Sequence, residues 1–283
     1  MVRKTLAVWT LASALACSLG ACGGPAQPEP SEPAAPESSS VAEPAASEPA
    51  AAPSPDPAEV VAAPDRSEDD REVDARRKPA KLLAFLELEP GMKVADIGAG
   101  TGYTTELLAR MVGPEGRVYG QNPAFVLERF ARAGWDERRA KAVNAEIVVS
   151  LEREFDDPFP DDIEPLDRVV NVLFFHDFGW MEIDRAAHLA DAFAALRPGG
   201  RYVIIDASAA EGRGLDDSKS LHRVEEALVV REFEAAGFVR GRSADFLRNP
   251  EDTLDWNALP WRDAERAARG EFSDKFVLEF IKP

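Results

Sequence analysis

Three glycines lie where a short apolar run meets a helical pattern. Residues 94–97 are typical of a buried strand, and they lead directly into Gly98, Gly100 and Gly102. Apolar residues over 104–112 then recur at the spacing of an amphipathic helix. Glycine lets the backbone approach a ligand closely, and a helix that begins beside it directs free N–H groups toward that ligand. This strand, turn and helix therefore predict a small-molecule site.

The glycine spacing separates several kinds of ligand site. A dinucleotide fingerprint reads G-x-G-x-x-G, but Tyr103 stands where its third glycine belongs. A phosphate-binding loop needs Gly-Lys followed by Ser or Thr, and this loop lacks that sequence. The pattern that fits is an acidic residue, Asp96, then one apolar residue and G-x-G-x-G. It resembles motif I of the class I S-adenosylmethionine (SAM)-dependent methyltransferases. The alternative is a glycine turn in an ordinary α/β protein.

Strands and helices alternate along the chain, which predicts an α/β fold with a mainly parallel sheet covered on both faces. The expected strands lie at 94–97, 117–120, 147–149, 168–173 and 202–206, followed by two late strands near 239 and over 275–281. Their order resembles the class I methyltransferases across residues 70–283. The resemblance implies a Rossmann-like, seven-stranded sheet whose last strand is antiparallel. Shorter stretches at 221–223, 245–250 and 274–278 resemble a bacterial group of predicted, largely uncharacterised methyltransferases.

The candidate cofactor residues lie at the carboxyl ends of the strands, where ligands bind in this type of sheet. The resemblance implies that Asp96 holds the glycine loop and reaches the methionine amino group of SAM. About 20 residues after the glycines a carboxylate should bind the ribose hydroxyls, but Gln121 and Asn122 stand there. Amides accept weaker hydrogen bonds than charged carboxylates do. The alternative is that these amides only begin a turn. Asn171, in the fourth strand, is a further cofactor-binding candidate.

The most reactive side chains, His176 and Asp177, follow the fourth strand. Four aromatic residues lie around them in the sequence: Phe174, Phe175, Phe178 and Trp180. The resemblance places the methyl acceptor here, and the aromatic side chains are expected to wall an apolar slot for it. His176 titrates near neutrality and is expected to accept a proton from the acceptor, with Asp177 orienting it. The alternative is that the aromatic residues belong to the core and His176 is a loop residue.

The other histidines and the cysteines predict no metal site. His188 lies within a helical stretch and is expected at the surface, and His222 is expected to be structural. The histidine spacing does not match a ligand motif such as His-Glu-x-x-His. Cys17 and Cys22 both precede the expected domain, which therefore has no cysteine for a metal site or a disulfide. The serines lack the Gly-x-Ser-x-Gly elbow of hydrolases.

The first 64 residues are predicted to be an export signal and a linker. Residues 1–22 have a basic start and a short apolar stretch, and they end in Leu-Gly-Ala-Cys. This ending resembles the lipobox of bacterial lipoproteins, which implies cleavage before Cys22 and lipid on its sulfur. Simple secretion or an uncleaved anchor are the alternatives. Residues 23–64 are nearly all Ala, Pro, Glu and Ser, which predicts a disordered tether. The methyltransferase-like domain is expected over 65–283.

These features together predict an exported enzyme, lipid-anchored to a bacterial membrane on its periplasmic or outer-surface side. It would use SAM as cofactor to methylate a small molecule. The net charge of −18 argues against a nucleic-acid partner. One alternative is a non-catalytic SAM-fold binding module of the cell envelope, because SAM is made in the cytosol. The other is a nucleotide-dependent oxidoreductase, which the glycine spacing disfavours.

Overall fold

The computed structural model describes residues 53–141, 143–259 and 264–283. The predicted signal peptide and the linker up to residue 52 lie outside this part of the chain. None of the helices within it is long and apolar enough to span a membrane.

Regular structure begins before the predicted domain boundary at residue 65. Helix α1 (Pro57–Val61) lies in what was expected to be linker. Asp56 caps this helix by accepting a hydrogen bond of 2.8 Å from the N–H of Ala58. The Val60 side chain is buried against the core. A cap, a proline in the first turn and one buried valine therefore extend the domain in the N-terminal direction.

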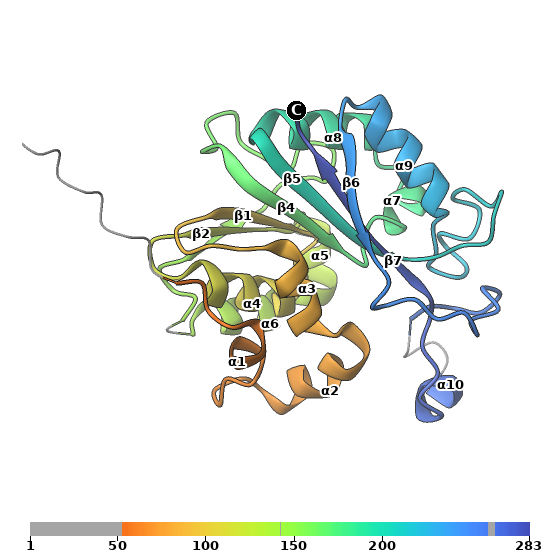
Figure 1. Ribbon diagram of the computed structural model, residues 1–283, viewed down its shortest axis with the longest axis horizontal. Helices are drawn as coiled ribbons and strands as arrows, with labels where there is room; N and C mark the ends of the chain where they lie inside the picture. The colour runs from red at the N-terminus through yellow and green to blue at the C-terminus, as the bar shows by residue number, and fades with distance from the viewer. Residues whose placement is uncertain (1–52, 142, 260–263) are drawn as a thin grey trace, which may run out of the picture. The chain divides into compact units, whose positions relative to one another are not determined.

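Seven strands form one sheet in the order β3-β2-β1-β4-β5-β7-β6 (Figure 1). The strands are β1 (Lys93–Ile97), β2 (Arg117–Gln121), β3 (Val148–Leu151), β4 (Leu166–Val172), β5 (Leu196–Ala207), β6 (Val239–Ala244) and β7 (Lys275–Ile281). Strands β1 to β5 pair in parallel, and β7 runs antiparallel to both of its neighbours, β5 and β6. The predicted Rossmann-like sheet with an antiparallel last strand is confirmed.

Helices cover both faces of this sheet. Besides α1, the described chain contains α2 (Glu68–Arg77), α3 (Pro79–Leu86), α4 (Tyr103–Val112), α5 (Ala124–Val126), a π-helical turn η1 (Leu127–Ala131), α6 (Arg132–Arg139), α7 (Asp177–Trp180), α8 (Arg185–Ala195), α9 (Glu226–Ala235) and α10 (Ala264–Ala268). Figure 1 shows α3, α4 and α6 gathered on one side of the sheet and α8 and α9 on the other. This double cover explains why the central strands are continuous apolar runs.

Leu221, Val224 and Leu228 have helical spacing in the sequence, but helix α9 begins only at Glu226 because the backbone of Val224 bonds to the end of β5. The N–H of Val224 donates to the Ala207 carbonyl at 3.0 Å, and the Val224 carbonyl accepts from Ala209 at 2.9 Å. The chain therefore runs beside the end of β5 before it turns into α9. Residues 221–223 therefore lie at the carboxyl end of β5.

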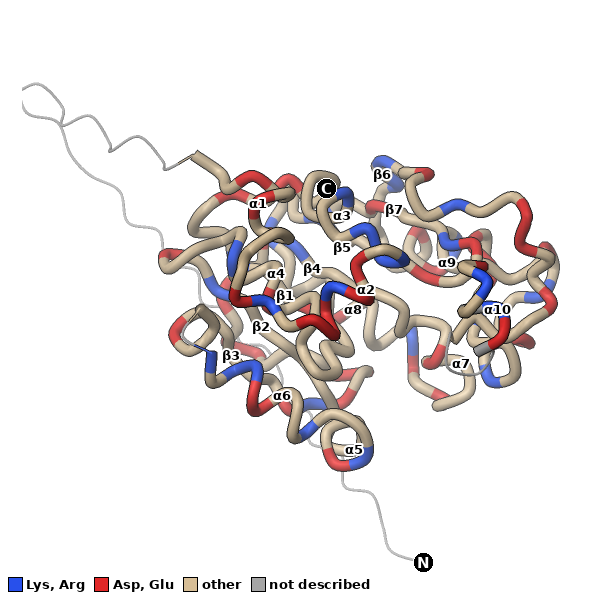
Figure 2. The backbone as a smooth tube through the Cα atoms, turned by 90° about the horizontal axis from the view of Figure 1, so that it is seen from below, with Lys and Arg blue, Asp and Glu red and all other residues tan. Residues whose placement is uncertain are grey.

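Acidic and basic residues are interspersed along the described chain (Figure 2). Helix α2 is an example, with Glu68, Asp69 and Asp70 in its first turn and Arg76 and Arg77 in its last. This order suits the helix dipole, which favours negative charge at the N-terminus and positive charge at the C-terminus. The charges of α2 therefore stabilise the helix and are available to contact neighbouring elements.

Candidate functional site

The glycine loop joins β1 to α4, and all three glycines have left-handed backbones. Their φ angles are 65° at Gly98, 58° at Gly100 and 85° at Gly102. A Cβ atom would lie 2.6 Å from the Phe174 ring at Gly98 and 2.8 Å from the Arg138 side chain at Gly102. At Gly100 the nearest atom would be a loop carbonyl oxygen at 4.0 Å. Packing therefore requires glycine at the outer two positions, whereas the space beside Gly100 is open to a ligand.

Gln121, the last residue of β2, and Asn122, which follows it, hold the glycine loop in place by hydrogen bonds. The Gln121 Oε1 atom accepts from the N–H of Gly98 at 3.2 Å, and its Nε2 atom donates to the Arg153 carbonyl at 2.6 Å. Asn122 exchanges two hydrogen bonds with Gly100, accepting from its N–H at 2.8 Å and donating to its carbonyl at 3.1 Å. Both amides are buried. These hydrogen bonds position the glycine loop. Binding of the SAM ribose by Gln121 or Asn122 stays a prediction, and it would require the amides to give up some of these bonds for bonds to the ribose hydroxyls.

Asp96 and Asn171 are also buried within the sheet. The Asp96 carboxylate accepts a hydrogen bond of 2.6 Å from the Thr105 hydroxyl, which ties β1 to the first turns of α4. Burial raises the pKa of Asp96 to about 7, although the Thr105 hydrogen bond and the charge of Arg77 work in the opposite direction. Asn171 lies opposite Ile97 in β4 with its side chain wholly buried. Contact of either residue with SAM stays a prediction.

A cavity of about 430 Å³ opens at the carboxyl ends of β4 and β5. Helix α2, the loops after these two strands and the segment before β7 form its walls, which include Arg76, Arg77, His176, His222, Trp256 and Lys275. Its size is that of a small-molecule site, typically about 300–1,000 Å³. Leu173, the first residue after β4, lines the cavity with a φ of 61°. Strained backbone of this kind is concentrated at functional sites.

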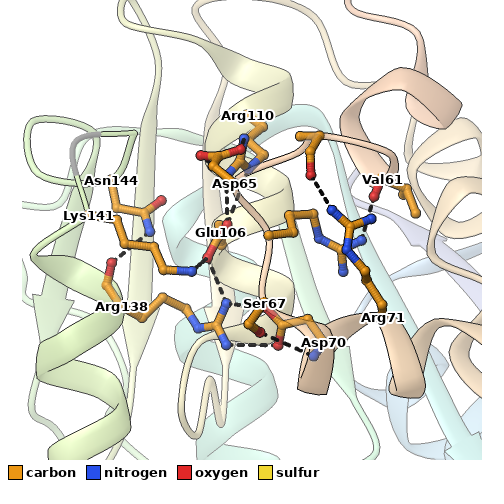
Figure 3. A network of polar contacts seen from close by, with 12 residues as sticks. Val61, Asp65, Ser67, Asp70, Arg71, Glu106, Arg110, Arg138, Lys141 and Asn144 are labelled. Atoms are coloured by element: carbon orange, nitrogen blue, oxygen red, sulfur yellow. Dashed lines mark hydrogen bonds and ion pairs between the residues drawn. The ribbon is translucent and has the colours of Figure 1, made fainter.

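A polar network fastens helix α2, one wall of the cavity, to α4 and α6 (Figure 3). Arg138 donates two hydrogen bonds to Asp70, at 2.8 and 2.9 Å, and one to Glu106, at 2.6 Å. Glu106 also accepts from Arg110 at 2.7 Å and from Lys141 at 2.9 Å. Burial would raise the pKa of Glu106, but these cations hold it below its usual range. The network therefore fixes α2 beside the cavity.

His176, Asp177 and His222 meet at the cavity wall. The His222 Nδ1 atom lies 3.3 Å from His176 Nε2 and 3.2 Å from Asp177 Oδ1, and the latter two atoms are 3.3 Å apart. Asp206 lies behind His176, accepting from its N–H at 2.8 Å and approaching its Nδ1 atom to 2.6 Å. Trp180 Nε1 donates to Asp177 Oδ1 at 2.6 Å. The structure thus places His222 and Asp206, which the sequence analysis did not select as functional residues, beside the predicted catalytic pair.

Sequence spacing gave little sign of His222 and Asp206. His222 lies 46 residues from His176 in the chain, and no ligand motif has that spacing. The one available signal was the resemblance of residues 221–223 to the bacterial methyltransferase group. Asp206 ends the fifth predicted strand, a position where side chains reach a ligand site in this type of sheet.

The pKa of His176 bears directly on its predicted role as a base. Burial by itself would lower that pKa, but the nearby carboxylates of Asp206 and Asp177 raise it to about 10. Burial would raise the pKa of Asp177, but hydrogen bonds from His176 and His222 lower it well below its usual range. Without a bound cation, the His176 imidazole is therefore protonated at neutral pH. Such an imidazole must lose a proton before it can accept one, and the base role stays a prediction.

The sequence analysis expected His188 at the surface, but the structure places it wholly buried in α8 against Tyr202 of β5. Its Nδ1 atom lies 2.6 Å from the Phe155 carbonyl oxygen, and its Nε2 atom lies 2.9 Å from the Tyr202 hydroxyl. Burial lowers the pKa of His188 to about 4, so the ring is neutral at neutral pH. His188 is a satisfied core residue because both ring nitrogens have partners.

The aromatic residues after β4 do not form the expected acceptor slot. Phe175 and Phe178 are fully buried, with ring centroids 5.2 Å apart, and Phe174 packs at 4.7 Å from Phe155. Phe175 also packs against Phe233 of α9, with ring centroids 6.0 Å apart, so Phe175 and Phe178 belong to the core. Phe174 is half-buried and lies beside Gly98 of the glycine loop. The cavity instead takes its aromatic groups from the distant residues Trp256 and Phe272.

Parts of this sequence are similar to known methyltransferases. The family model of protein-L-isoaspartate(D-aspartate) O-methyltransferase matches residues 62–149. The protein-L-isoaspartate O-methyltransferase of Aeropyrum pernix is 41% identical over 69 residues, which are 24% of this chain and 26% of its own length. The demethylmenaquinone methyltransferase of Symbiobacterium thermophilum is 29% identical over 131 residues, 45% of this chain and 47% of its own. The chain thus spans about a quarter to a half of these curated relatives.

Solved structures extend the likeness to most of the domain. A SAM dependent methyltransferase from Aquifex aeolicus matches with a TM-score of 0.53 and 20% sequence identity, over 81% of this chain and 99% of that one. At this identity the match establishes the fold. The family-model match covers β1, the glycine loop, α4 and β2, which carry all the candidate cofactor residues up to Asn122, whereas the candidate Asn171 in β4 lies outside the match.

Proposed function

We propose that this chain, whose fold matches that of a SAM dependent methyltransferase, binds SAM at the glycine loop and methylates a small molecule in the cavity at the ends of β4 and β5. The observation that carries this proposal is the open space beside Gly100 at the end of β1, on the same edge of the sheet as the cavity of about 430 Å³ at the ends of β4 and β5. Ligands of such sheets bind at this edge. The two sequence relatives described above are also methyltransferases.

The reaction would be an in-line displacement. The acceptor atom forms a bond to the methyl carbon while the bond from that carbon to the sulfonium sulfur breaks, and S-adenosylhomocysteine leaves. If the acceptor atom carries a proton, a base or water takes it up. The main contribution of the protein is then alignment, because holding both reactants in attack geometry removes much of the entropic barrier. The candidate catalytic residues are His176, which lines the cavity, and Asp177, whose Oδ1 atom lies 3.3 Å from His176 Nε2.

Replacing Gly100 by valine should abolish SAM binding. The new side chain would project into the open space that the ligand is proposed to occupy, because its Cβ atom would meet no protein atom beyond its chain neighbours closer than 4.0 Å. The measurement is calorimetric titration of the full chain with SAM. Gly214→Val is the matched control, because Gly214 also has a left-handed backbone, with φ 51°, and an empty surrounding. Equal SAM affinity in Gly100→Val and wild type, or heat with NAD and none with SAM, would contradict the proposal.

We also propose that the enzyme is exported and tethered to a bacterial membrane through lipid on Cys22. Support comes from the sequence, where a basic start and an apolar stretch precede Leu-Gly-Ala-Cys. The proline-rich linker would then hold the domain away from the lipid surface. The acceptor would be a small molecule available on the periplasmic or outer-surface side.

Substituting serine for Cys22 should release the protein from membranes or block its processing. Several acyl chains anchor a protein firmly, whereas a single chain gives only marginal binding, so loss of the lipidated cysteine should have a large effect. Membrane fractionation and incorporation of labelled fatty acid test this. Cys17→Ser is the control, because Cys17 follows a poorer lipobox and should leave both results unchanged. Wild-type protein that takes up no label would exclude the tether.

A further inference from the structure

We propose that His176, Asp177 and His222 form a binding site for a divalent transition-metal ion such as Zn²⁺. Their three facing atoms make a nearly equilateral triangle with edges of 3.2, 3.3 and 3.3 Å. Around a tetrahedral zinc ion with bonds of about 2.0–2.1 Å, ligand atoms lie about 3.3–3.4 Å apart. The triangle therefore already has the dimensions of three ligands around one ion.

Hydrogen bonds hold these three side chains together when no ion is bound. In the tautomer that carries the His222 proton on Nε2, His222 Nδ1 accepts from His176 Nε2 at 3.3 Å. Asp177 Oδ1 lies 3.3 Å from the same His176 nitrogen and accepts from Trp180 Nε1 at 2.6 Å. A cation would replace the shared proton, because the lone pairs of both facing nitrogens and one lone pair of Asp177 Oδ1 would then be free to bind it.

Asp206 sets the tautomer of His176 that such a site requires. Its carboxylate lies 2.6 Å from His176 Nδ1, so the proton of a neutral ring is held there and the Nε2 lone pair faces the other two ligands. Asp206 is itself fixed by the N–H groups of His176 and Ala207, at 2.8 and 2.7 Å. A carboxylate behind a histidine ligand is the usual outer shell of a metal site.

The fold also holds His222 in an unfavourable backbone conformation at the triangle. Its φ is 52°, which non-glycine residues seldom adopt and which is found most often at functional sites. The neighbouring Arg223 is wholly buried, pairs with Asp252 at 2.9 Å and donates to the Ser208 carbonyl at 2.8 Å. These bonds fix the chain on one side of His222 and keep its side chain directed at His176.

Ligand chemistry narrows the class of ion. Two imidazoles and one carboxylate suit zinc and the similar divalent ions of iron, cobalt and nickel, whereas magnesium and calcium prefer oxygen ligands. Three protein ligands leave a coordination position open. Because both histidines line the cavity, a water or an oxygen atom of a bound molecule would complete the site. If that molecule is the methyl acceptor, the ion would hold the acceptor in the cavity, and this step rests on the proposed function. Metal binding by the three side chains does not rest on it.

Calorimetric titration of the chelator-treated full chain with Zn²⁺ tests the site, and Co²⁺ gives a visible spectrum that reports its coordination. We expect one tight ion per chain. Loss of an outer-shell partner typically weakens metal binding by about 10- to 100-fold. His222→Gln and Asp177→Asn, which each remove a ligand, should weaken zinc binding by more than this. Asp206→Asn, which changes a positioning residue, should weaken it within that range. Asp216→Asn is the control, since this carboxylate lies in the same loop with its side chain 72% exposed.

Circular dichroism of each variant without metal checks that the fold survives, and Asp177→Asn preserves side-chain size if His222→Gln does not fold. Equal zinc affinity in wild type, Asp177→Asn and His222→Gln would overturn the proposal, because the ion would then bind elsewhere, for example at Cys17 or Cys22. Absence of tight zinc binding in the wild type would also overturn it. A separate SAM titration distinguishes the two proposals, since failed SAM binding with intact zinc binding contradicts the methyltransferase proposal alone.

Discussion

Replacing His176 by alanine should lower the turnover of methyl transfer by about 100- to 10,000-fold and leave SAM affinity nearly unchanged. The imidazole lines the cavity after β4 and makes no hydrogen bond to the glycine loop. Its loss would remove either the proton acceptor or a ligand of the proposed metal ion. Steady-state kinetics, together with SAM calorimetry, separate the effect on turnover from the effect on cofactor binding.

The pH profile of chelator-treated protein then distinguishes the two roles of His176. Because the carboxylates of Asp206 and Asp177 raise its pKa to about 10, the neutral imidazole is a small fraction near pH 7. That fraction grows about tenfold for each pH unit up to the pKa. A rate that depends on His176 as base should therefore rise from pH 7 toward 10, rather than level off above the unperturbed value of about 6.5. A metal-ligand role instead predicts loss of activity on chelation and recovery with Zn²⁺.

Unaltered turnover in His176→Ala, with the wild-type pH profile, would reduce His176 to a structural residue. Catalysis would then depend on proximity, with water as the proton acceptor. Thermal unfolding of the variant is a necessary control because His176 is buried beside Asp206 and removal of the ring leaves that carboxylate without one partner.

Replacing Arg223 by methionine should lower the free energy of unfolding by about 3–5 kcal/mol. The Arg223 and Asp252 side chains are both 0% exposed, and two hydrogen bonds of 2.9 and 3.2 Å join them. Methionine would fill part of the space but leave a buried carboxylate without its cation, and that uncompensated charge is the source of the cost. Denaturant titration followed by circular dichroism measures the change.

A double variant and a surface variant give the comparison for this stability prediction. Arg223→Met combined with Asp252→Leu removes both charges and should recover part of the lost stability, because the uncompensated carboxylate is gone. Arg240→Met removes an arginine whose side chain is 45% exposed and pairs with Glu226 at 3.5 Å, and it should cost at most about 1 kcal/mol. Similar losses in Arg223→Met and Arg240→Met would contradict the assigned role of burial.

The sequence by itself determined the architecture, because its signals are local. Apolar runs, helical spacing and the three glycines of the loop follow from the backbone conformations that each segment can adopt. They predicted the order of strands and helices, and the family resemblance added the antiparallel last strand, as observed in β7. The same local reasoning placed His176 and Asp177 after β4, at the edge of the sheet where ligands bind.

Tertiary structure alone decided where side chains point and which distant residues meet. Gln121 and Asn122 turn toward the glycine loop because its N–H groups need acceptors, and the aromatic rings after β4 turn inward because the core offers them apolar contacts. His222 reaches His176 across 46 residues because the loop after β5 returns to the end of that strand, where Val224 forms a parallel bridge with Ser208. Such contacts depend on the path of the whole chain, and no spacing within the sequence specifies them.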